Sequence, residues 1–347
     1  MIKKTYKFSS ANVDVYFAAA FKQLNKVIDQ KKAILITDEN VFKAHKSKLK
    51  GWNVITLKAG EQFKIQPTAD AIVEQLIAFQ ADRSSILVGV GGGVITDLTG
   101  YVASIYMRGI QFGFVPTSLL AMVDASIGGK NGVDVGEYKN MVGVIRQPSF
   151  LFYDSDFLST LPEQEWSNGF AEIIKHASIL DSALFARLAK MNLAQLQADK
   201  KLLDLLIRKN VEIKSSVVKN DEFEKGDRRL LNFGHTLGHA LETQYELSHG
   251  QAIALGMVFA CWLSNKLLGF KSELDVEQLL VQYGLPTRAA FDVNRVFEIF
   301  KMDKKRTTKN MRFVLLSAIG KGRVVELPLT ELKKHLVAFN RLNKTQK

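Results

Sequence analysis

The chain has 347 residues, 47% of them apolar and 24% charged, which is ordinary for a globular protein of about two domains. Its single cysteine, Cys261, excludes an intrachain disulfide and fits a reducing cytoplasm. The net charge is +12, but the basic residues are dispersed and accompany no DNA-binding motif, so we expect no nucleic-acid partner. The polar start lacks a signal-peptide core and no apolar run reaches spanning length, so we expect no membrane.

Short apolar runs alternate with helical patterns in the first half of the chain. The sequence predicts strands at 33–37, 54–57, 85–90, 112–115 and 151–153. Helices are predicted at 68–79 and 94–104. Strands that alternate with helices indicate a parallel, Rossmann-like sheet with helices on both faces.

Long helical periodicities dominate from about residue 161 onward. Helices are predicted at 166–180, 183–191, 201–218, 229–247, 252–268, 293–300 and 332–342, and a small hairpin at 312–316 and 322–326. We therefore expect an α/β nucleotide-binding domain over 1–160 and a helical, metal- and substrate-binding domain over 161–347.

A glycine run follows the predicted strand at 85–90. Gly91, Gly92 and Gly93 let a phosphate approach the backbone, and the helix that follows offers free N–H groups. Val94 stands where a dinucleotide fingerprint starting at Gly89 has its third glycine, and no Gly-Lys-Ser/Thr of a P-loop follows. The run indicates a nucleotide site, with a tight strand–helix turn as the alternative.

Cations and amides gather near other turns of the chain. Lys130 follows the pair at 128–129, Lys139 and Asn140 are adjacent, and Arg108 precedes a glycine. Each alone is typical of surface charge or a turn. Together they favour a polyanionic substrate that carries a phosphate and a carboxylate.

Three of the six histidines lie within fifteen residues. His235 and His239 are four apart and share one face of a helix, and His249 follows. Glu172 is a candidate carboxylate ligand, with Lys175 three residues later. A catalytic zinc takes three protein ligands and an open position, so these residues predict a metal site.

The histidine spacing leaves the ligand set open. Thr236 stands where a zinc peptidase has its general base, which excludes that motif. Spacing alone does not say which histidines bind metal and which transfer protons. Upstream, Arg228 and Asn232 join the same face if the helix starts early, and such a row is costly to bury unless it binds something charged.

In combination these segments resemble the 3-dehydroquinate synthase family of sugar-phosphate cyclases. The resemblance covers nearly the whole chain. It is carried by GGGVITD (91–97), YMRG (106–109), PTSLLAMVDASIGGKNGVD (116–134), YKNMVG (138–143), LSTLP (158–162), GFAEIIKH (169–176), LLNFGHTLGHALE (230–242) and HGQAIALGM (249–257).

The resemblance implies a role for each matching residue. The NAD-binding positions map onto Asp38, Glu61, Lys64, Gly92, Gly93, Asp97, Thr117, Ser118, Lys130, Lys139 and Thr160. The ligands of a zinc or cobalt ion map onto Glu172, His235 and His249. The catalytic and substrate-binding positions map onto Arg108, Asp124, Lys130, Asn140, Lys175, Lys214, Glu224, Arg228, Asn232 and His239.

The resemblance also implies an assembly. Arg108 matches an arginine that reaches into the neighbouring subunit's site, which implies a homodimer. One of Lys304 and Lys305 matches a phosphate-binding lysine.

The implied reaction converts 3-deoxy-D-arabino-heptulosonate 7-phosphate to 3-dehydroquinate and phosphate in the shikimate pathway. It combines transient oxidation by NAD, phosphate elimination, re-reduction and aldol closure. The alternatives are another sugar-phosphate cyclase, a metal- and NAD-dependent polyol dehydrogenase, and a nucleic-acid-binding or scaffolding protein.

Four positions depart from the family's usual residues. Thr96 replaces a glycine, Ser118 a threonine, Asp134 an asparagine and Gln251 a glutamate. None removes an implied metal ligand, so we expect the departures to change supporting contacts only.

Overall fold

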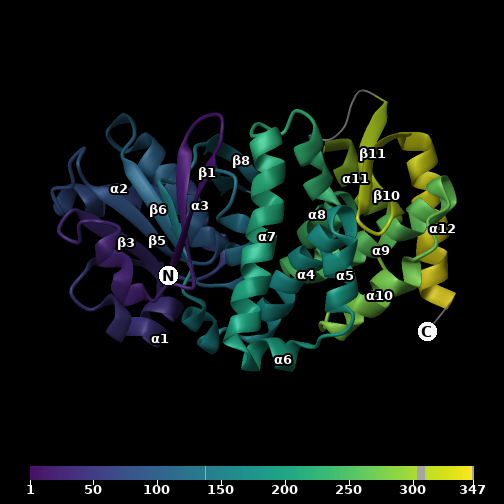
Figure 1. The fold of residues 1–347 in the computed structure, drawn as a ribbon. Helices are drawn as coiled ribbons and strands as arrows, with labels where there is room; N and C mark the ends of the chain where they lie inside the picture. The colour runs from purple at the N-terminus through teal and green to yellow at the C-terminus, as the bar shows by residue number, and fades with distance from the viewer. Residues whose placement is uncertain (137, 303–308, 346–347) are drawn as a thin grey trace. The chain divides into compact units, whose positions relative to one another are not determined.

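The computed structural model describes residues 1–136, 138–302 and 309–345 (Figure 1). The chain forms two compact units, each made of two segments. The first unit comprises Met1–Trp166 and Asp199–Phe223, and the second comprises Ser167–Ala198 and Glu224–Lys347. The sequence predicted a single boundary near residue 160, whereas the chain passes between the units three times.

A seven-stranded sheet is the centre of the first unit, with strand order β1-β2-β9-β6-β5-β3-β4. Every neighbouring pair is parallel except the antiparallel edge pair β1–β2. The sheet thus confirms the predicted Rossmann-like architecture. Its strands are β1 (Ile2–Lys7), β2 (Asn12–Phe17), β3 (Ala33–Asp38), β4 (Asn53–Leu57), β5 (Ile86–Gly91), β6 (Gln111–Pro116) and β9 (Phe150–Phe152).

The central strands are nearly continuous apolar runs because helices cover both faces of a parallel sheet. Leu35, Val88 and Val115 are fully buried in one core cluster. The edge strand β1 was not predicted, since its residues are largely exposed and rich in lysine.

The connections reverse direction between β3 and β5. After β3, α1 (Glu39–Leu49) leads outward to β4, and α2 (Gln66–Ala78) returns to β5 on the other side of β3. Then α3 (Gly93–Ile105) leads onward to β6. In such sheets ligands bind at the carboxyl ends of the strands beside this switch point.

Two further elements complete the first unit. A hairpin of β7 (Lys130–Val135) and β8 (Tyr138–Ile145) forms a separate two-stranded sheet that packs on α3. The long helix α7 (Lys200–Asn220) packs against a π-helical turn, η4 (Ala121–Ala125). The sequence placed α7 in the helical domain, because helical periodicity reports a buried face but not its partner.

The second unit is mostly helical and contains one hairpin, β10 (Asn310–Ala318) and β11 (Lys321–Pro328). Its helices are α4 (Glu163–Leu180, whose first turn belongs to the first unit), α5 (Ser182–Leu188), α6 (Leu193–Ala198), α8 (His235–Gln244), α9 (His249–Leu268), α10 (Glu273–Gln282), α11 (Val293–Met302) and α12 (Leu329–Thr345). Short 3₁₀ helices across the chain are η1 (Phe21–Lys26), η2 (Glu61–Phe63), η3 (Tyr106–Arg108), η5 (Ser155–Thr160) and η6 (Asp227–Asn232).

The prediction of one continuous helix at 229–247 is wrong, because the helix is interrupted at Gly234. The 3₁₀ helix η6 ends at Asn232, and α8 begins at His235 after Gly234 with φ 78°. A Cβ on Gly256 of α9 would lie 1.8 Å from the Gly234 carbonyl oxygen. The two glycines therefore let α8 and α9 cross at backbone contact, and Arg228 and Asn232 are not on the helix that carries His235.

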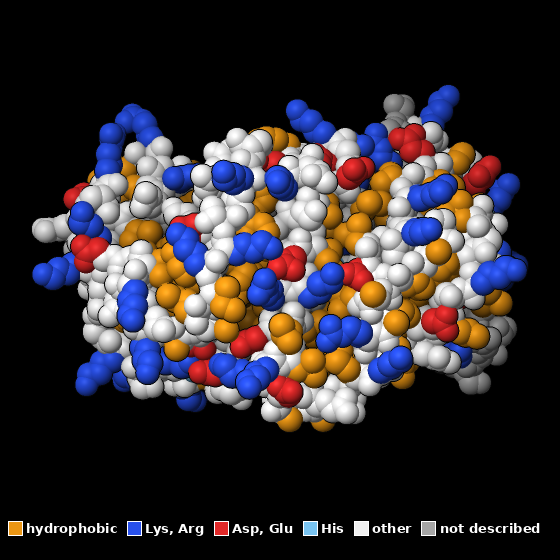
Figure 2. All heavy atoms as spheres, viewed as in Figure 1, with side chains coloured by type: hydrophobic (Ala, Val, Ile, Leu, Met, Phe, Trp, Pro, Cys, Tyr) orange, Lys and Arg blue, Asp and Glu red, His pale blue; other side chains and the backbone are white. Residues whose placement is uncertain are grey.

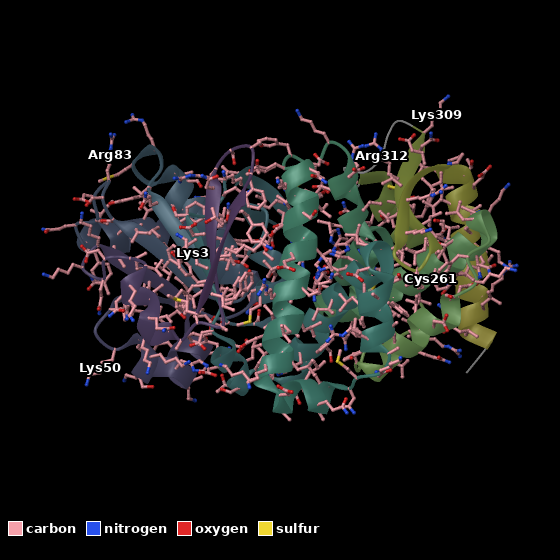
Figure 3. The ribbon with its side chains drawn as sticks, viewed as in Figure 1. Lys3, Lys50, Arg83, Cys261, Lys309 and Arg312 are labelled. Carbon is pink, nitrogen blue, oxygen red and sulfur yellow. The ribbon has the colours of Figure 1, made fainter. Side chains whose placement is uncertain are left out.

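Helix α9 is long and apolar enough to cross a membrane, contrary to the expectation that no such run exists. Of its 18 most apolar residues in sequence, 67% are buried inside the protein. It is a core helix, and the buried Cys261 lies on it (Figure 3). On the face in Figure 2, lysine and arginine side chains are scattered among apolar and acidic ones.

Candidate active site

Three side chains of the second unit converge in a possible metal centre. Glu172 projects from α4, His235 begins α8, and His249 begins α9. Glu172 Oε1 lies 3.2 Å from His249 Nε2 and 3.5 Å from His235 Nε2. Ligands about 2.0–2.1 Å from a tetrahedral zinc lie roughly 3.3–3.4 Å apart, so this spacing fits one ion.

The far side of each imidazole ring has its own partner. His235 Nδ1 lies 3.1 Å from the Phe233 carbonyl oxygen, which leaves Nε2 to face Glu172. His249 Nδ1 lies 3.7 Å from Glu242 Oε1. Burial lowers the pKa of His249, but the carboxylates of Glu172 and Glu242 outweigh it and raise that pKa to about 10. Such outer partners fix ring orientation and raise ligand basicity.

Glu242 was missed by the sequence reasoning as a functional residue. It lies seven residues before His249 on the preceding helix, and only the turn between α8 and α9 brings the two together. A carboxylate within a histidine-rich segment is the signal by which it could have been found.

Lys175 and His239 surround the metal centre. Lys175 is buried and pairs closely with the fully buried Glu172, one turn earlier on α4. The rings of His239 and His235 have centroids 5.1 Å apart and meet edge to face. The structure thus brings the four predicted second-unit residues Glu172, His235, His249 and Lys175 together, with His239 beside them.

The start of α9 is fixed by a capping box. Ser248 Oγ accepts from the Gln251 N–H, and Gln251 Oε1 accepts from the Ser248 N–H at 3.0 Å. Asn168 of α4 accepts hydrogen bonds from Ser248 and Gly250. Gln251 thus caps the start of α9, so this departure leaves His249 in place.

A second polar group of this unit contains Glu224, Arg228 and Asn232. Asn232 Nδ2 donates to Glu224 Oε1 at 2.7 Å, and Glu224 has a left-handed φ of 58°. Arg228 is 2% exposed on η6. A buried guanidinium favours an anionic ligand. The Asn232 nitrogen donates to Glu224 and to the Arg229 carbonyl, so its amide oxygen is the group oriented toward a ligand donor.

The predicted NAD residues of the first unit follow the carboxyl ends of its parallel strands. Asp38 ends β3, Gly92 and Gly93 follow β5, and Thr117 and Ser118 follow β6. Because these strands are parallel, all of these ends meet at one edge of the sheet, beside the switch point. Glu61, Lys64 and Thr160 follow β4 and β9 in the same way.

The glycine turn leaves room for a ligand. A Cβ on Gly92 would approach Ser118 Oγ to 3.4 Å, and one on Gly93 would approach the Ala125 Cβ to 3.4 Å. Added side chains would therefore fill a cradle at the N-terminus of α3, which suits a pyrophosphate. The Thr96 hydroxyl donates to the Gly93 carbonyl at 2.9 Å, so this departure reinforces the turn.

Lys64 is the centre of a buried polar network in the first unit. Its ammonium lies 2.7 Å from Asp97 Oδ2 and donates to Asn140 Oδ1 at 2.7 Å. Burial opposes its charge, but Asp97 and Glu61 outweigh burial and raise the pKa of Lys64. Asp134 Oδ1 accepts from the Asn140 N–H at 2.6 Å, which fixes Asn140 at φ 55°. Sequence reasoning missed this link between a cofactor position and a substrate position.

The remaining predicted residues are one aspartate and several basic side chains, most of them in the first unit. Lys214 of α7 is buried and pairs with Asp124 Oδ1 of η4 at 2.8 Å. Lys130 begins β7, Lys139 lies on β8, and both are exposed. Arg108 is exposed in a tight turn before β6. Lys304 and Lys305 lie outside the described residues.

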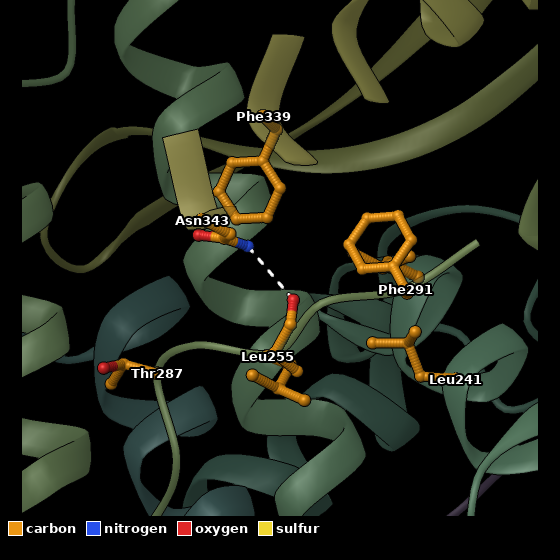
Figure 4. A pocket seen from close by; sticks show the side chains of 8 residues that line it. Leu241, Leu255, Thr287, Phe291, Phe339 and Asn343 are labelled. Atoms are coloured by element: carbon orange, nitrogen blue, oxygen red, sulfur yellow. Dashed lines mark hydrogen bonds between the residues drawn. The ribbon is translucent and has the colours of Figure 1, made fainter. Parts of the chain in front are cut away.

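An apolar depression of the second unit is not a candidate for this chemistry (Figure 4). No charged side chain lines it, and its dashed contact joins Asn343 Nδ2 to the Ala289 carbonyl at 3.4 Å. Its lining residues are Leu237, Leu241, Leu255, Thr287, Ala289, Phe291, Phe339 and Asn343.

Comparisons with known proteins agree along the chain. Residues 54–168 match the family model 3-dehydroquinate synthase N-terminal, and residues 169–306 match 3-dehydroquinate synthase C-terminal. A 3-dehydroquinate synthase of Acetivibrio thermocellus is 37% identical over 91% of this chain and 92% of its own length. One of Campylobacter jejuni subsp. doylei is 40% identical over 80% of this chain and 82% of its own.

A solved structure is similar in fold. The structure of 2-deoxy-scyllo-inosose synthase complexed with carbaglucose-6-phosphate, NAD+ and Co2+ has a TM-score of 0.85 and 26% sequence identity. The match covers 96% of this chain and 99% of that one.

Proposed function

The chain belongs to the 3-dehydroquinate synthase family, and from that premise we propose that it converts 3-deoxy-D-arabino-heptulosonate 7-phosphate to 3-dehydroquinate and phosphate. It is a phosphate-eliminating lyase that uses NAD and a divalent metal ion. One observation carries the proposal within this chain. Glu172, which is buried, and His235 and His249, which are partly exposed, each offer one ligand atom, and these atoms lie within 4.8 Å of one another.

The two cofactors fit the residues that would hold them. Glu172, His235 and His249 offer a carboxylate and two imidazoles, which suit zinc or cobalt and leave a position for substrate. Asp38, the glycine cradle and the Lys64–Asp97 pair would hold NAD. When bound, the metal acidifies substrate hydroxyls and the nicotinamide reversibly accepts a hydride.

The second unit's side chains would bind and orient the sugar acid. Buried Arg228 would supply a planar donor pair for a carboxylate, and Asn232, held by Glu224, would offer its amide oxygen to a substrate hydroxyl. Lys175 pairs with one oxygen of the Glu172 carboxylate, whose other oxygen faces the histidines, and it would stabilise an oxyanion next to the metal. His239 carries no metal in this scheme and moves protons at the substrate.

The family resemblance assigns further substrate-binding positions to residues of the first unit. Lys64 holds the side-chain amide of Asn140 through its oxygen, and Asp134 holds the main-chain N–H of the same residue. Lys214 is positioned by Asp124, and Lys130 lies at the start of β7. With Arg108 they give phosphate and ring hydroxyls oriented partners, so positioning and electrostatics supply much of the catalysis.

The proposal includes a homodimer formed through the β7–β8 hairpin. Tyr138, Met141 and Val142 of β8 are 58%, 64% and 41% exposed, and Ile105 and Met107 near the end of α3 are each 43% exposed. Large apolar side chains gathered on exposed neighbouring elements are typical of an interaction surface. Sedimentation at micromolar concentration would test it: Met141→Glu would leave monomer, whereas an unchanged mass would contradict this surface.

The proposed location of this soluble enzyme is the cytoplasm. A free, buried thiol and a reaction that needs NAD both suit that compartment. Fractionation of cells that express the protein would test the location directly.

The function itself is tested by phosphate release from 3-deoxy-D-arabino-heptulosonate 7-phosphate with NAD present. We expect release that stops on chelation, returns with zinc or cobalt and leaves no net NADH. Stoichiometric NADH would instead identify a polyol dehydrogenase. No release by metal- and NAD-loaded protein would contradict the proposal and point to a different sugar phosphate.

A further inference from the structure

The turn that presents Arg108 has an unusual backbone. Met107 and Arg108 have positive φ values of 49° and 65°, and Gly109 follows at 115°. Residues with a Cβ rarely adopt a positive φ, so two such residues in succession persist only where the surrounding structure fixes them. The turn lies between α3 and β6, and both Met107 and Arg108 are exposed, so their own side chains do little to fix it.

Arg146 fastens the two ends of this turn. Its Nη1 donates to the Ala103 carbonyl and its Nη2 to the Ile110 carbonyl, each at 2.9 Å. The Ile110 N–H also donates to Ala103, at 2.8 Å. The guanidinium carbon lies 5.2 Å from the ring centroid of Phe112, and this cation–π contact helps to keep the guanidinium group in its orientation. A rigid guanidinium can bridge two carbonyls in this way, whereas a single ammonium cannot match both.

We propose that Arg146 is a positioning residue that holds Arg108 in its working orientation. The inference rests on the proposed function and on the role that the resemblance implies for Arg108, which reaches into the neighbouring subunit's site. Arg146 lies after β8, far from Arg108 in sequence, and belongs to no motif that carried the family resemblance. It acts through the backbone of residues 103–110 and contacts no proposed ligand position with its side chain.

The side chain can be tested apart from the main chain. The Arg146 N–H donates to the Gly129 carbonyl, and the Arg146 carbonyl accepts from Asn131. Those main-chain bonds hold the segment that leads to Lys130, and they survive any substitution at 146. A side-chain variant therefore loosens the Arg108 turn and leaves the Lys130 segment attached.

The first experiment compares kinetics of Arg146→Met, Arg146→Lys and a control, Arg83→Met. Arg83 is exposed and points away from the first unit (Figure 3). We expect Arg146→Met to lower kcat/KM for the sugar phosphate about 10- to 100-fold, with the KM for NAD and the metal content unchanged. Arg146→Lys should recover part of the loss, and Arg83→Met should match wild type. Arg146→Gln replaces Arg146→Met if the latter does not fold.

A double-variant cycle tests whether Arg146 acts through Arg108. In homodimers, Arg108→Ala with Arg146→Met should be about as active as Arg108→Ala alone, because the clamp has nothing left to orient. Losses that multiply would overturn the proposal. Wild-type activity of Arg108→Ala would overturn it as well, while leaving the synthase reaction of the wild-type enzyme intact.

Mixed dimers give a readout that a general structural role would not. A His235→Ala subunit has a dead metal site but a normal Arg108 turn, so it should restore the site of an Arg146→Met subunit, as it should for Arg108→Ala. Rescue of Arg108→Ala but not of Arg146→Met would overturn the proposal. Rescue of neither would refute the crossing of Arg108 between subunits, and the double-variant cycle would still decide the role of Arg146.

Discussion

The metal centre of the second unit and the nucleotide cradle of the first are built from different materials. The centre consists of side chains: Glu172, His235 and His249 come from three helices, and their ligand atoms lie within 4.8 Å of one another. The cradle consists largely of backbone, at the ends of β3, β5 and β6. The metal centre therefore depends on residue identity, whereas the cradle depends on the absence of side chains.

The sharpest test of this contrast is loss of a metal ligand. We expect His235→Ala to lose bound metal and all measurable phosphate release, because two ligands do not replace three. His239→Ala is the matched control four residues along α8: it should keep its metal and still lose most activity. Metal analysis of both variants after dialysis checks this, and metal near the wild-type amount in His235→Ala would refute the ligand assignment.

The same small change should have opposite consequences in the two regions. Gly256→Ala places a Cβ 1.8 Å from the Gly234 oxygen, and such overpacking costs about 1–3 kcal/mol or more of stability. Gly93→Ala meets only a 3.4 Å contact, so it should leave stability nearly unchanged and raise the KM for NAD instead. Urea unfolding and NAD titration of both variants separate the two effects. A stable Gly256→Ala would show that α8 and α9 can move apart.

How far the sequence predicts each region follows from this difference. Short continuous apolar runs predicted the central strands, which are buried on both faces, and helical periodicity predicted most helices, which are buried on one face. The β1–β2 and β7–β8 hairpins left no such pattern, since β1 and β8 are largely exposed. The break at Gly234 was missed because it depends on contact with Gly256, which periodicity does not report.

The same limit applies to the site. Histidine spacing predicted a metal centre, and family resemblance chose among the histidines. Neither predicted that Glu242 would face His249, that Lys64 would hold Asn140, or that Arg146 would span the Arg108 turn. Each of these contacts joins segments through the fold, so it leaves no local pattern in the sequence.

A smaller effect tests the support around the metal. Glu242→Gln keeps the shape of the side chain but removes the charge that faces His249 Nδ1. Outer partners of metal ligands typically contribute 10- to 100-fold in metal affinity, so we expect a loss in that range with the fold intact. Competition with a chelator measures it. An unchanged affinity would show that Glu242 does not orient His249.

The smallest expected effect concerns Glu222, where the chain leaves the first unit. Its carboxylate accepts from the Ser9 hydroxyl, from Ser10 and from Gln147 Nε2 at 2.8 Å. Burial opposes the charge, but these donors outweigh burial and lower the pKa of Glu222 to about 2. Because the folded pKa lies below the unfolded value near 4.3, the stabilisation is present above that pH and is lost as pH falls toward 2.

Glu222→Gln removes this dependence. We expect it to destabilise the first unit by about 1–3 kcal/mol at pH 7, the range for hydrogen bonds to a charged group that lose their charge. Wild type and variant should converge as pH falls, because the wild-type carboxyl becomes neutral too. Urea unfolding at pH 7 and pH 3 measures the gap at each pH. If the stability difference between wild type and variant stays constant with pH, the charge of Glu222 does not stabilise the end of α7. Its contacts with the β1–β2 turn would then act through shape alone.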